Sequence, residues 1–326
     1  MNIHFPYTYK QAISCKYSKH WIKAMRSEIQ NFYDNDIMTF IKHLPKGVKP
    51  TSTKWVYTLK KDDNGNIIKF KARLVARGFS QKKGTDYDLT YSPTLSLDSL
   101  KLIIALASKF HWYLMQLDIK FAYLNAPLDK NIYITVPPGD KNFGKGFWLL
   151  KKALYGLKQS GRQWNLHFTS FLKNNYFIQL RSEPCIFKKM TGNKVVCIIG
   201  VYVDDLLIAG TDYHINDIIR KIKKTFKISN CGKANYILGI NIEKHIFNYS
   251  ISQTQLINDI LKKFNITNIK KTKSPCSGEN KLIRKDNTLF DKTTYKSAVG
   301  SLIYLSRCTR PDISFAVGKV ARRSYH

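Results

Sequence analysis

The chain has 326 residues, of which 44% are hydrophobic and 13% aromatic, and such a composition excludes a disordered or low-complexity protein. It carries 54 Lys and Arg against 22 Asp and Glu, a formal net charge of +32, and this excess is costly in self-repulsion unless a polyanion shares the surface. Nucleic acid is the first candidate for this polyanion, since counterion release favours phosphate contacts. An anionic membrane surface is the rival candidate. No charge-free apolar run approaches the ~20 residues that a membrane-spanning helix needs.

The N-terminal part of the sequence predicts a helix followed by a hairpin. Apolar residues recur at helical spacing over residues 20–32, which indicates an amphipathic helix. Two β-prone runs, 54–59 and 67–79, are separated by the turn-forming sequence 62–66. This arrangement predicts a β-hairpin.

The second strand of this hairpin carries a row of cations. They recur at even offsets, and alternate residues of a strand share one face: Lys69, Lys71, Arg73 and Arg77. One basic face with aromatic residues nearby suits contact with phosphates and nucleotides. A solvated, charged hairpin is the alternative.

A helix and a strand that ends in a lone acid come next. Residues 98–110 have the helical pattern, with Asp98 as the expected N-cap. The expected buried stripe of this helix consists of Leu102, Ile103, Leu106, Ala107 and Phe110. Residues 112–119 predict a buried strand, with Asp118 near its end. Such an acid is usually a cap or half of an ion pair, and it gains chemical interest only if the fold brings it to other acids.

The most apolar stretch of the chain surrounds two adjacent acids, Asp204 and Asp205. The runs 195–203 and 206–210 on either side are β-prone, so they predict a hairpin with the two acids between its strands. Asp-Asp is a poor turn, because two-residue hairpin turns favour Asn-Gly or Asp-Gly. A hard divalent cation would neutralise the pair, since such ions prefer carboxylate oxygen. A solvated acidic turn is the alternative.

The remaining segments alternate between strand and helix patterns. Strands are predicted at 132–136, 147–150 and 185–188, and a helix is predicted from the segment 154–164 to about Leu172. The later predictions are a helix at 213–226, a hairpin of 236–242 and 249–252, a helix at 253–264, a basic connector at 262–285, and two helical segments between 294 and 322.

Cysteine usage and the N-terminus bear on the compartment. The six cysteines are scattered, without Cys-x-x-Cys or paired His spacing, so reduced thiols are expected rather than a zinc site or a disulfide framework. The first residues lack the basic and then apolar layout of a signal peptide. We therefore expect an intracellular protein without a membrane partner.

Taken in order, these segments resemble the reverse transcriptase of copia-type long-terminal-repeat retrotransposons. The resemblance extends from about Trp21 to Arg322. It rests on seven blocks in the order of the family: Lys54–Val56; Lys71–Gln81; Gln116–Lys120; Leu154–Gln159; Tyr202–Asp205; Tyr236–Ile240; and Gly300–Leu305 with Arg310–Asp312. A lone Tyr-x-Asp-Asp is a weak signal, whereas seven ordered blocks are a strong one.

The resemblance implies an α+β right-hand polymerase fold, with a palm built on an antiparallel sheet, interleaved fingers and a helical thumb. The implied division is 1–92 for the N-terminal segment and fingers, 93–126 for the first palm part, 127–156 for the second fingers part, 157–243 for the second palm part, 244–290 for the thumb and 291–326 for the start of a connection region. The ribonuclease H region of the family is expected to be absent, as are protease and integrase.

The resemblance also implies an RNA-directed DNA polymerase that adds dNTPs to a primer 3′-hydroxyl by two-metal-ion phosphoryl transfer. The implied catalytic residues are Asp118, Asp204 and Asp205, which with the Ile119 carbonyl would hold two Mg²⁺ or Mn²⁺ ions. The implied partners are an RNA template, a primer–template duplex and dNTPs, in a cytoplasmic virus-like particle or in the nucleus.

Further roles are implied by the matching blocks. Lys71, Arg73 and Arg77 are candidates for the triphosphate clamp. Tyr123 would exclude the ribose 2′-hydroxyl, with a core aromatic as the alternative. The nucleotide and template side would be lined by Tyr155, Gly156, Lys158 and Gln159. The primer end would be steadied by Leu238, Gly239 and Ile240, where Gly239 permits close backbone approach.

Two other functions stay open. A catalytically inactive nucleic-acid-binding fragment of a decayed element would explain the basic excess, although the intact carboxylates argue against advanced decay. A metal-dependent nuclease would also use three acids, but a His or Lys that could activate water is not apparent beside Asp118 or Asp204. The sequence does not predict the oligomeric state.

Overall fold

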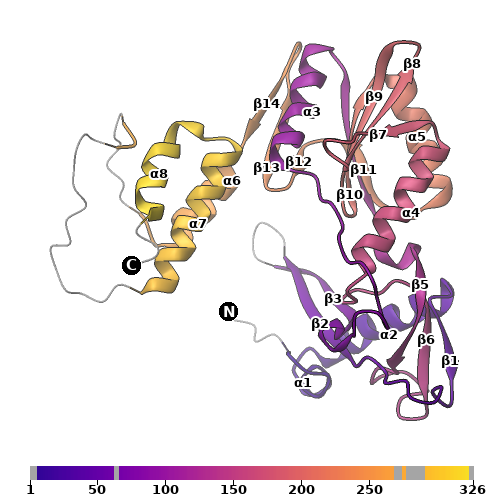
Figure 1. The fold of residues 1–326 in the computed structure, drawn as a ribbon. Helices are drawn as coiled ribbons and strands as arrows, with labels where there is room; N and C mark the ends of the chain where they lie inside the picture. The colour runs from indigo at the N-terminus through magenta and orange to yellow at the C-terminus, as the bar shows by residue number, and fades with distance from the viewer. Residues whose placement is uncertain (1–5, 62–65, 268–273, 277–290, 323–326) are drawn as a thin grey trace.

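The structure, a computed structural model, describes residues 6–61, 66–267, 274–276 and 291–322 (Figure 1). It consists of a first unit around the N-terminal helices, a six-stranded central sheet, and the C-terminal helices α6–α8, which lie to one side of the sheet (Figure 1). The α+β class predicted from the sequence is confirmed, and the paired strands of each sheet are antiparallel.

The first unit packs helix α2 against a hairpin and a three-stranded sheet. Its helices are α1 (Tyr9–Ser14) and α2 (Ser18–Asp34), its hairpin is β2 (Thr53–Lys61) with β3 (Ile67–Ala76), and its sheet has the order β1 (Met38–Ile41), β6 (Phe147–Lys152), β5 (Pro127–Thr135). The predicted helix at 20–32 is confirmed, and its expected apolar face is buried: Trp21, Met25, Ile29 and Phe32. Most of the turn predicted at 62–66 lies outside the described residues.

Strand β3 ends three residues earlier than predicted. The chain leaves the hairpin after Ala76 and forms a short 3₁₀ helix, η1 (Gly78–Ser80). A Cβ on Gly78 would lie 2.1 Å from the carbonyl oxygen of Gly156, so two backbones pass too closely here for a side chain. This close approach ties the end of the hairpin to the segment that precedes α4.

The central sheet has the order β11-β4-β10-β9-β8-β7. Its strands are β4 (Tyr113–Ile119), β7 (Phe177–Gln179), β8 (Ile186–Thr191), β9 (Lys194–Tyr202), β10 (Asp205–Gly210) and β11 (Ile228–Lys233). Both faces are covered, because Leu206 and Ile208 pack into the core with helices α4 (Ser160–Asn174) and α5 (Asp212–Thr225), whereas Leu207 and Ala209 pack into the core with α3 (Leu97–Lys109). Burial on both faces explains the unbroken apolar run around the acids.

Two predicted details of helix α3 were wrong. Ser96 is the N-cap, since its hydroxyl accepts a hydrogen bond from the Ser99 amide, and Asp98 lies in the first turn instead. Leu102 and Phe110 are exposed, and the buried residues of the helix are Leu100, Ile103, Ile104 and Ala107. Ser and Asp are equally good caps, so the local sequence did not distinguish the two starts.

A small third sheet and the C-terminal helices complete the described chain. The predicted strand 236–242 is interrupted at Leu238 and Gly239, which form a turn between β12 (Tyr236–Ile237) and β13 (Ile240–Lys244); β13 pairs with β14 (Tyr249–Ser252) as expected. The helices are α6 (Thr254–Lys263), α7 (Lys292–Cys308) and α8 (Ser314–Ala321), with 3₁₀ helices η2 (Ala122–Asn125) and η3 (Pro311–Ile313) elsewhere. Much of the predicted basic connector lies outside the described residues.

Two further observations bear on the sequence predictions. All six cysteines are free thiols. Over the part of the chain that the structure describes, every helix is too short or too polar to cross a membrane.

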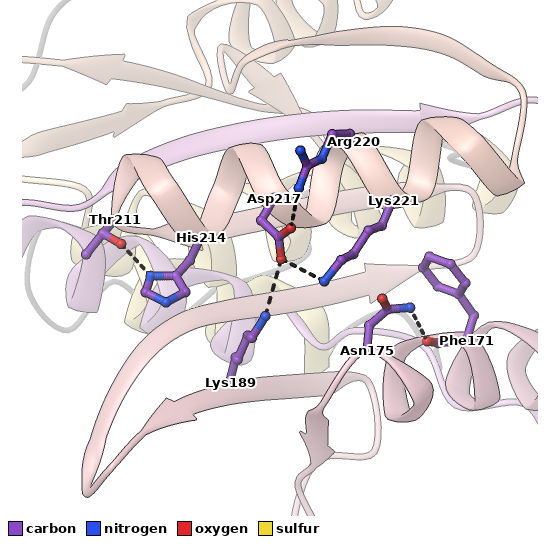
Figure 2. A network of polar contacts seen from close by, with 8 residues as sticks. All are labelled: Phe171, Asn175, Lys189, Thr211, His214, Asp217, Arg220 and Lys221. Carbon is purple, nitrogen blue, oxygen red and sulfur yellow. Dashed lines mark hydrogen bonds and ion pairs between the residues drawn. The ribbon is translucent and has the colours of Figure 1, made fainter.

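An acid with three cationic partners ties helix α5 to the sheet (Figure 2). The Asp217 carboxylate accepts from the Lys221 ammonium at 2.8 Å, from the Arg220 guanidinium at 3.0 Å and from the Lys189 ammonium of β8 at 3.4 Å. Its side chain is 15% exposed, and the hydrogen bonds to these cations lower the pKa of Asp217 to about 2. The carboxylate therefore stays ionised at any pH near neutral.

Replacing Asp217 by asparagine is expected to lower the free energy of unfolding by about 1 kcal/mol at neutral pH. An acid whose pKa is depressed by folding adds stability above its unfolded pKa, and that stability is lost as the pH falls through the folded value of about 2. Urea unfolding at neutral and acid pH measures the effect, with the exposed Asp129→Asn as control. An equal loss of unfolding free energy for both variants, or a loss that persists when the carboxylate is protonated, would contradict the stabilising role of the Asp217 ion pairs.

Candidate active site at the β4–β10 junction

The register of β10 against β4 brings the three predicted acids together. Asp205 stands opposite Asp118 in this antiparallel pair, and on its other side it pairs with Tyr202 of β9. The Ile119 amide donates to the Asp204 carbonyl oxygen at 2.9 Å. Acids that are far apart in the sequence therefore come together at one end of two interior strands of the central sheet.

The hairpin turn between β9 and β10 is formed by Val203 and Asp204, not by the two acids as predicted. Tyr202 and Asp205 are a strand pair, so Asp205 is the first residue of β10. Val203 has a φ of 55°, a left-handed conformation that is strained for a β-branched residue. The indole of Trp164 donates to the Val203 carbonyl oxygen at 2.7 Å and holds this conformation from helix α4.

The acids repel one another in a partly buried setting. Burial raises the pKa of Asp204, the charge of Asp118 adds to the increase, and the nearby cations Arg73 and Lys71 oppose it. Burial also raises the pKa of Asp205, with further increases from the charges of Asp204 and Asp118. Acids whose pKa values are raised by burial and by mutual repulsion favour a bound cation, because the cation stabilises their ionised forms.

Two neutral side chains hold the acids in their present positions, and neither was predicted. The Ser229 hydroxyl of β11 donates a short hydrogen bond to the Asp118 carboxylate, and Gln116 of β4 bonds to the Asp205 carboxylate. Ser229 has no sequence signal of its own, since it follows helix α5 in an unremarkable stretch. Gln116 lies in a block that matches the family, two residues before Asp118.

The donor set fits a hard divalent cation in its chemistry. Carboxylate oxygens are the ligands that Mg²⁺ and Mn²⁺ prefer, and a cation would relieve the repulsion between Asp118, Asp204 and Asp205. Within the described ranges, however, no three His, Cys, Asp or Glu side chains are already arranged around one point. Ser229 bonds to Oδ2 of Asp118, and the other carboxylate oxygen, Oδ1, can still coordinate a cation.

Cationic and aromatic side chains from three segments lie beside the acids. The Arg73 guanidinium lies 5.8 Å from the ring centroid of Tyr155, and the rings of Tyr155 and Tyr123 are 5.0 Å apart. Burial and the charge of Asp204 raise the pKa of Tyr123, and the same two causes raise the pKa of Tyr155 to about 12. Burial lowers the pKa of Lys71, and repulsion from Arg73 lowers it further. The structure thus brings these four predicted residues to the acids.

Four other predicted residues have contacts away from the acids. Arg77 lies over the ring of Phe79, with its guanidinium 5.7 Å from the ring centroid. Gly156 has a φ of 89°, and a Cβ there would lie 2.1 Å from the Ala76 carbonyl oxygen.

The remaining two belong to a buried polar bridge. Gln159 is fully buried. Its side-chain oxygen accepts from the side-chain amide of Gln81 at 3.1 Å, and its side-chain nitrogen donates to the backbone carbonyl oxygen of Asp86 at 2.8 Å. The Lys158 amide donates to the Gln81 side-chain oxygen at 2.8 Å. These contacts join the loop after β3 to the segment before α4, and sequence reasoning missed Gln81 as the residue that links them.

The predicted primer-positioning residues form the tight turn between β12 and β13. Leu238 and Gly239 both have positive φ, at 48° and 75°, and Ile240 is fully buried. Leu238 belongs to the same core cluster as Tyr202, the residue that pairs with Asp205. The turn therefore lies on the side of the sheet that carries the acids, and it contacts helix α7 through Tyr304.

Comparison with known proteins identifies the family. The family model described as reverse transcriptase (RNA-dependent DNA polymerase) matches residues 35–277. The chain is 38% identical over 332 residues to the retrovirus-related Pol polyprotein from transposon TNT 1-94 of Nicotiana tabacum, covering 97% of this chain and 25% of that protein. It is 31% identical over 211 residues to the putative transposon Ty5-1 protein YCL074W of Saccharomyces cerevisiae, covering 63% of this chain and 68% of that protein.

A solved structure was also found, a foamy viral protease-reverse transcriptase in complex with double-stranded DNA. It aligns with a TM-score of 0.43 and 12% identity, covering 86% of this chain and 40% of that chain. At this TM-score the structural similarity carries no weight in the family assignment, which rests on the sequence matches.

The chain belongs to the reverse transcriptase (RNA-dependent DNA polymerase) family. Its relatives include the Pol polyproteins of copia-like transposons, as the sequence blocks predicted, and the chain spans about a quarter of the length of the polyprotein from TNT 1-94. The right-hand polymerase fold expected from the sequence is the fold of this family, and the antiparallel central sheet with helices on both faces agrees with it.

Proposed function

We propose that this chain is the polymerase part of a copia-type Pol polyprotein and that it copies an RNA template into DNA. The observation that carries the proposal is the β4–β10 register, which sets Asp118 opposite Asp205 beside the Asp204 turn. Family membership supports the same activity. In the reaction the primer 3′-hydroxyl attacks the α-phosphorus of a dNTP, a new phosphodiester bond forms, and pyrophosphate leaves.

The proposed ligands of two Mg²⁺ or Mn²⁺ ions are the carboxylates of Asp118, Asp204 and Asp205, with the Ile119 carbonyl oxygen as an additional donor. When bound, such ions lower the pKa of the primer hydroxyl and neutralise charge on the triphosphate. The chain itself contributes the positions of its acids, which the Val203 turn fixes through its hydrogen bond from Trp164.

The proposed triphosphate clamp is Arg73, with Lys71 beside it. Both cations are close enough to Asp204 to lower its pKa, whereas Arg77 is engaged with Phe79. Arg73 is also held by the ring of Tyr155, so less of its side-chain freedom is lost when a phosphate binds. A planar guanidinium suits bidentate contact with phosphate oxygens.

The proposed regions keep the boundaries expected from the sequence. The fingers would be residues 1–92 and 127–156, the palm 93–126 and 157–243, the thumb 244–290, and the start of the connection region 291–326. The division is supported by the first unit, which combines β1–β3 with β5 and β6, and by the central sheet, which contains β4 and β7–β11. Template RNA and the primer–template duplex are the proposed partners of the basic surface.

Tyr123 is proposed to select deoxynucleotides by occupying the space of a ribose 2′-hydroxyl. We expect Tyr123→Ala to raise the efficiency of rNTP relative to dNTP incorporation by at least about 10-fold, since a lost steric contact is worth one to two factors of ten in discrimination. The measurement is kcat/KM for a matched rNTP and dNTP, with the exposed Tyr213→Ala as control. Unchanged discrimination together with a lowered melting temperature would instead assign Tyr123 to the core.

The proposed activity is tested with a labelled DNA primer annealed to RNA, dNTPs and Mg²⁺ or Mn²⁺. Extension that stops when the divalent ion is chelated supports the proposal. A folded chain that binds the duplex without extending the primer would favour a catalytically inactive nucleic-acid-binding fragment. Shortening of the labelled primer would indicate a nuclease.

A further inference from the structure

One block of the sequence that matches the family has no role in the site described above. It comprises Gly300–Leu305 and Arg310–Asp312, on helix α7 and just after it. Helix α7 begins at Lys292, beyond the residues 35–277 that match the family model. The side chains at the end of α7 nevertheless reach back to the turn between β12 and β13.

Side chains from helix α7 and from the residue before α6 donate hydrogen bonds to both carbonyl oxygens of that turn. The Tyr304 hydroxyl of α7 donates a short hydrogen bond to the Leu238 carbonyl oxygen. The Gln253 side chain, immediately before α6, donates to the Gly239 carbonyl oxygen at 3.3 Å. The Thr309 hydroxyl at the end of α7 donates to the Gln253 side-chain oxygen at 2.9 Å. Gln253 is only 2% exposed, so its hydrogen bonds are sheltered from water.

The backbone of the turn depends on contacts of this kind. Leu238 has a φ of 48°, which is unfavourable for a residue with a side chain, and surrounding structure must hold it there. A Cβ on Gly239 would lie 3.4 Å from the Tyr304 hydroxyl oxygen and 3.5 Å from its ring, so the ring packs directly on the glycine backbone. The shape and position of the turn are therefore fixed from helix α7.

Tyr304 also lies close to the strand that leads into the acidic turn. Burial raises the pKa of Tyr304 to about 12, and Cys308, Tyr236 and Tyr202 are the neighbours that contribute to the increase. Tyr202 pairs with Asp205 at the end of β9. Tyr304 thus contacts the β12–β13 turn and packs against the same core cluster as Tyr202, the residue beside the acids.

We propose that Tyr304 is a positioning residue, supported by Gln253 and Thr309, that holds the Leu238–Gly239 turn in place. Through this turn it holds the primer 3′ end at the distance that nucleotide addition requires. That distance is measured from the three acids Asp118, Asp204 and Asp205. The inference rests on the proposed function, because the turn is assigned to the primer there. It gives residues 292–309 a role in the polymerase, although they lie beyond residues 35–277, the part of the chain that the family model matches.

Helix α7 offers a matched control for Tyr304. Tyr295 lies on the same helix, and its hydroxyl also donates to a backbone carbonyl oxygen, that of Val320 in α8, at 2.7 Å. Tyr304→Phe and Tyr295→Phe each remove one hydroxyl and keep the ring. Only the first removes a hydrogen bond to the β12–β13 turn, so any loss of general helix packing is common to both.

The experiment places 2-aminopurine, whose fluorescence depends on stacking, at the primer 3′ end of an RNA–DNA duplex bound to each full-length chain. We expect Tyr304→Phe to shift the fluorescence towards that of the free duplex, and Tyr295→Phe to match the wild-type complex. We also expect Tyr304→Phe to slow single-nucleotide addition by about 5-fold, the worth of one hydrogen bond, with KM for the dNTP unchanged. Thr309→Val, which removes the hydroxyl that supports Gln253, should change both readouts in the same direction.

Wild-type fluorescence from all three variants would overturn the inference, as would equal effects of Tyr304→Phe and Tyr295→Phe. The fluorescence readout does not require catalysis. If the wild-type chain extends no primer but the Tyr304→Phe complex still shows its shift, the proposed activity fails while the positioning role stands.

Discussion

Replacing Asp205 by asparagine is expected to reduce nucleotide addition by at least about 1,000-fold without unfolding the chain. The substitution removes one of three carboxylates at the β4–β10 junction, and a metal ion held there is worth several kcal/mol of transition-state stabilisation. Asparagine has nearly the same shape and can still accept the hydrogen bond from Gln116. The measurement is single-turnover addition of a dNTP to a primer on RNA.

The same variant is expected to be at least as stable as the wild-type chain at neutral pH. Burial and the charges of Asp204 and Asp118 raise the pKa of Asp205, so folding disfavours its ionised form. An acid whose folded pKa is raised lowers the free energy of unfolding as the pH increases through its titration range. Removing the charge relieves this cost, and the advantage should vanish at acid pH, where the wild-type carboxyl is protonated.

The exposed Asp212→Asn is the control for both measurements, since this acid lies at the start of α5, away from the junction. It should extend primers at the wild-type rate and show no such gain in melting temperature. Extension by Asp205→Asn at a rate close to wild type would remove Asp205 from the catalytic set. A large loss of stability would assign the acid a structural role.

Replacing Arg73 by alanine is expected to raise KM for dNTPs by about 10- to 100-fold, because a hydrogen bond to a charged group is worth about 1.5–3 kcal/mol. Arg73 is the cation that lies near Asp204 and also over the ring of Tyr155. Arg73→Lys should recover only part of the loss, since lysine keeps the charge but lacks the planar fork and the ring contact. Steady-state kinetics with varied dNTP measures both.

Arg26→Ala is the matched control for Arg73→Ala, since Arg26 is an exposed arginine on α2. Its KM for dNTPs should equal that of the wild-type chain. An unchanged KM for Arg73→Ala, with weaker binding of the primer–template duplex, would move Arg73 from the nucleotide site to the duplex surface. A rise in KM for Arg77→Ala instead would identify the residue over Phe79 as the clamp.

Much of the architecture was predictable because its causes are local. The spacing of Trp21, Met25, Ile29 and Phe32 defines the buried face of α2, and the apolar residues around Asp204 predict strands buried in a core. The position of Asp118 opposite Asp205, by contrast, has no local cause. It depends on the pairing of two strands far apart in the chain, and it was predicted only because the order of the blocks resembled a known family.

The features that the sequence did not predict depend on long-range side-chain contacts. The turn forms at Val203 and Asp204 because pairing of Tyr202 with Asp205 and the indole of Trp164 fix it there, against the local preference for glycine. Ser229 reaches Asp118 from a strand with no distinguishing pattern. The β12–β13 turn divides an apolar run that reads as one continuous strand, because contacts from helix α7 hold it.

The most direct test of the polymerase assignment is extension of a DNA primer on a mixed-sequence RNA template, with the product sequenced. The purified wild-type chain, given dNTPs and Mg²⁺ or Mn²⁺, should yield DNA complementary to the template, and Asp204→Asn should yield none. A folded wild-type chain that binds the duplex and adds no nucleotide, or an Asp204→Asn chain that copies the RNA equally well, would contradict the account.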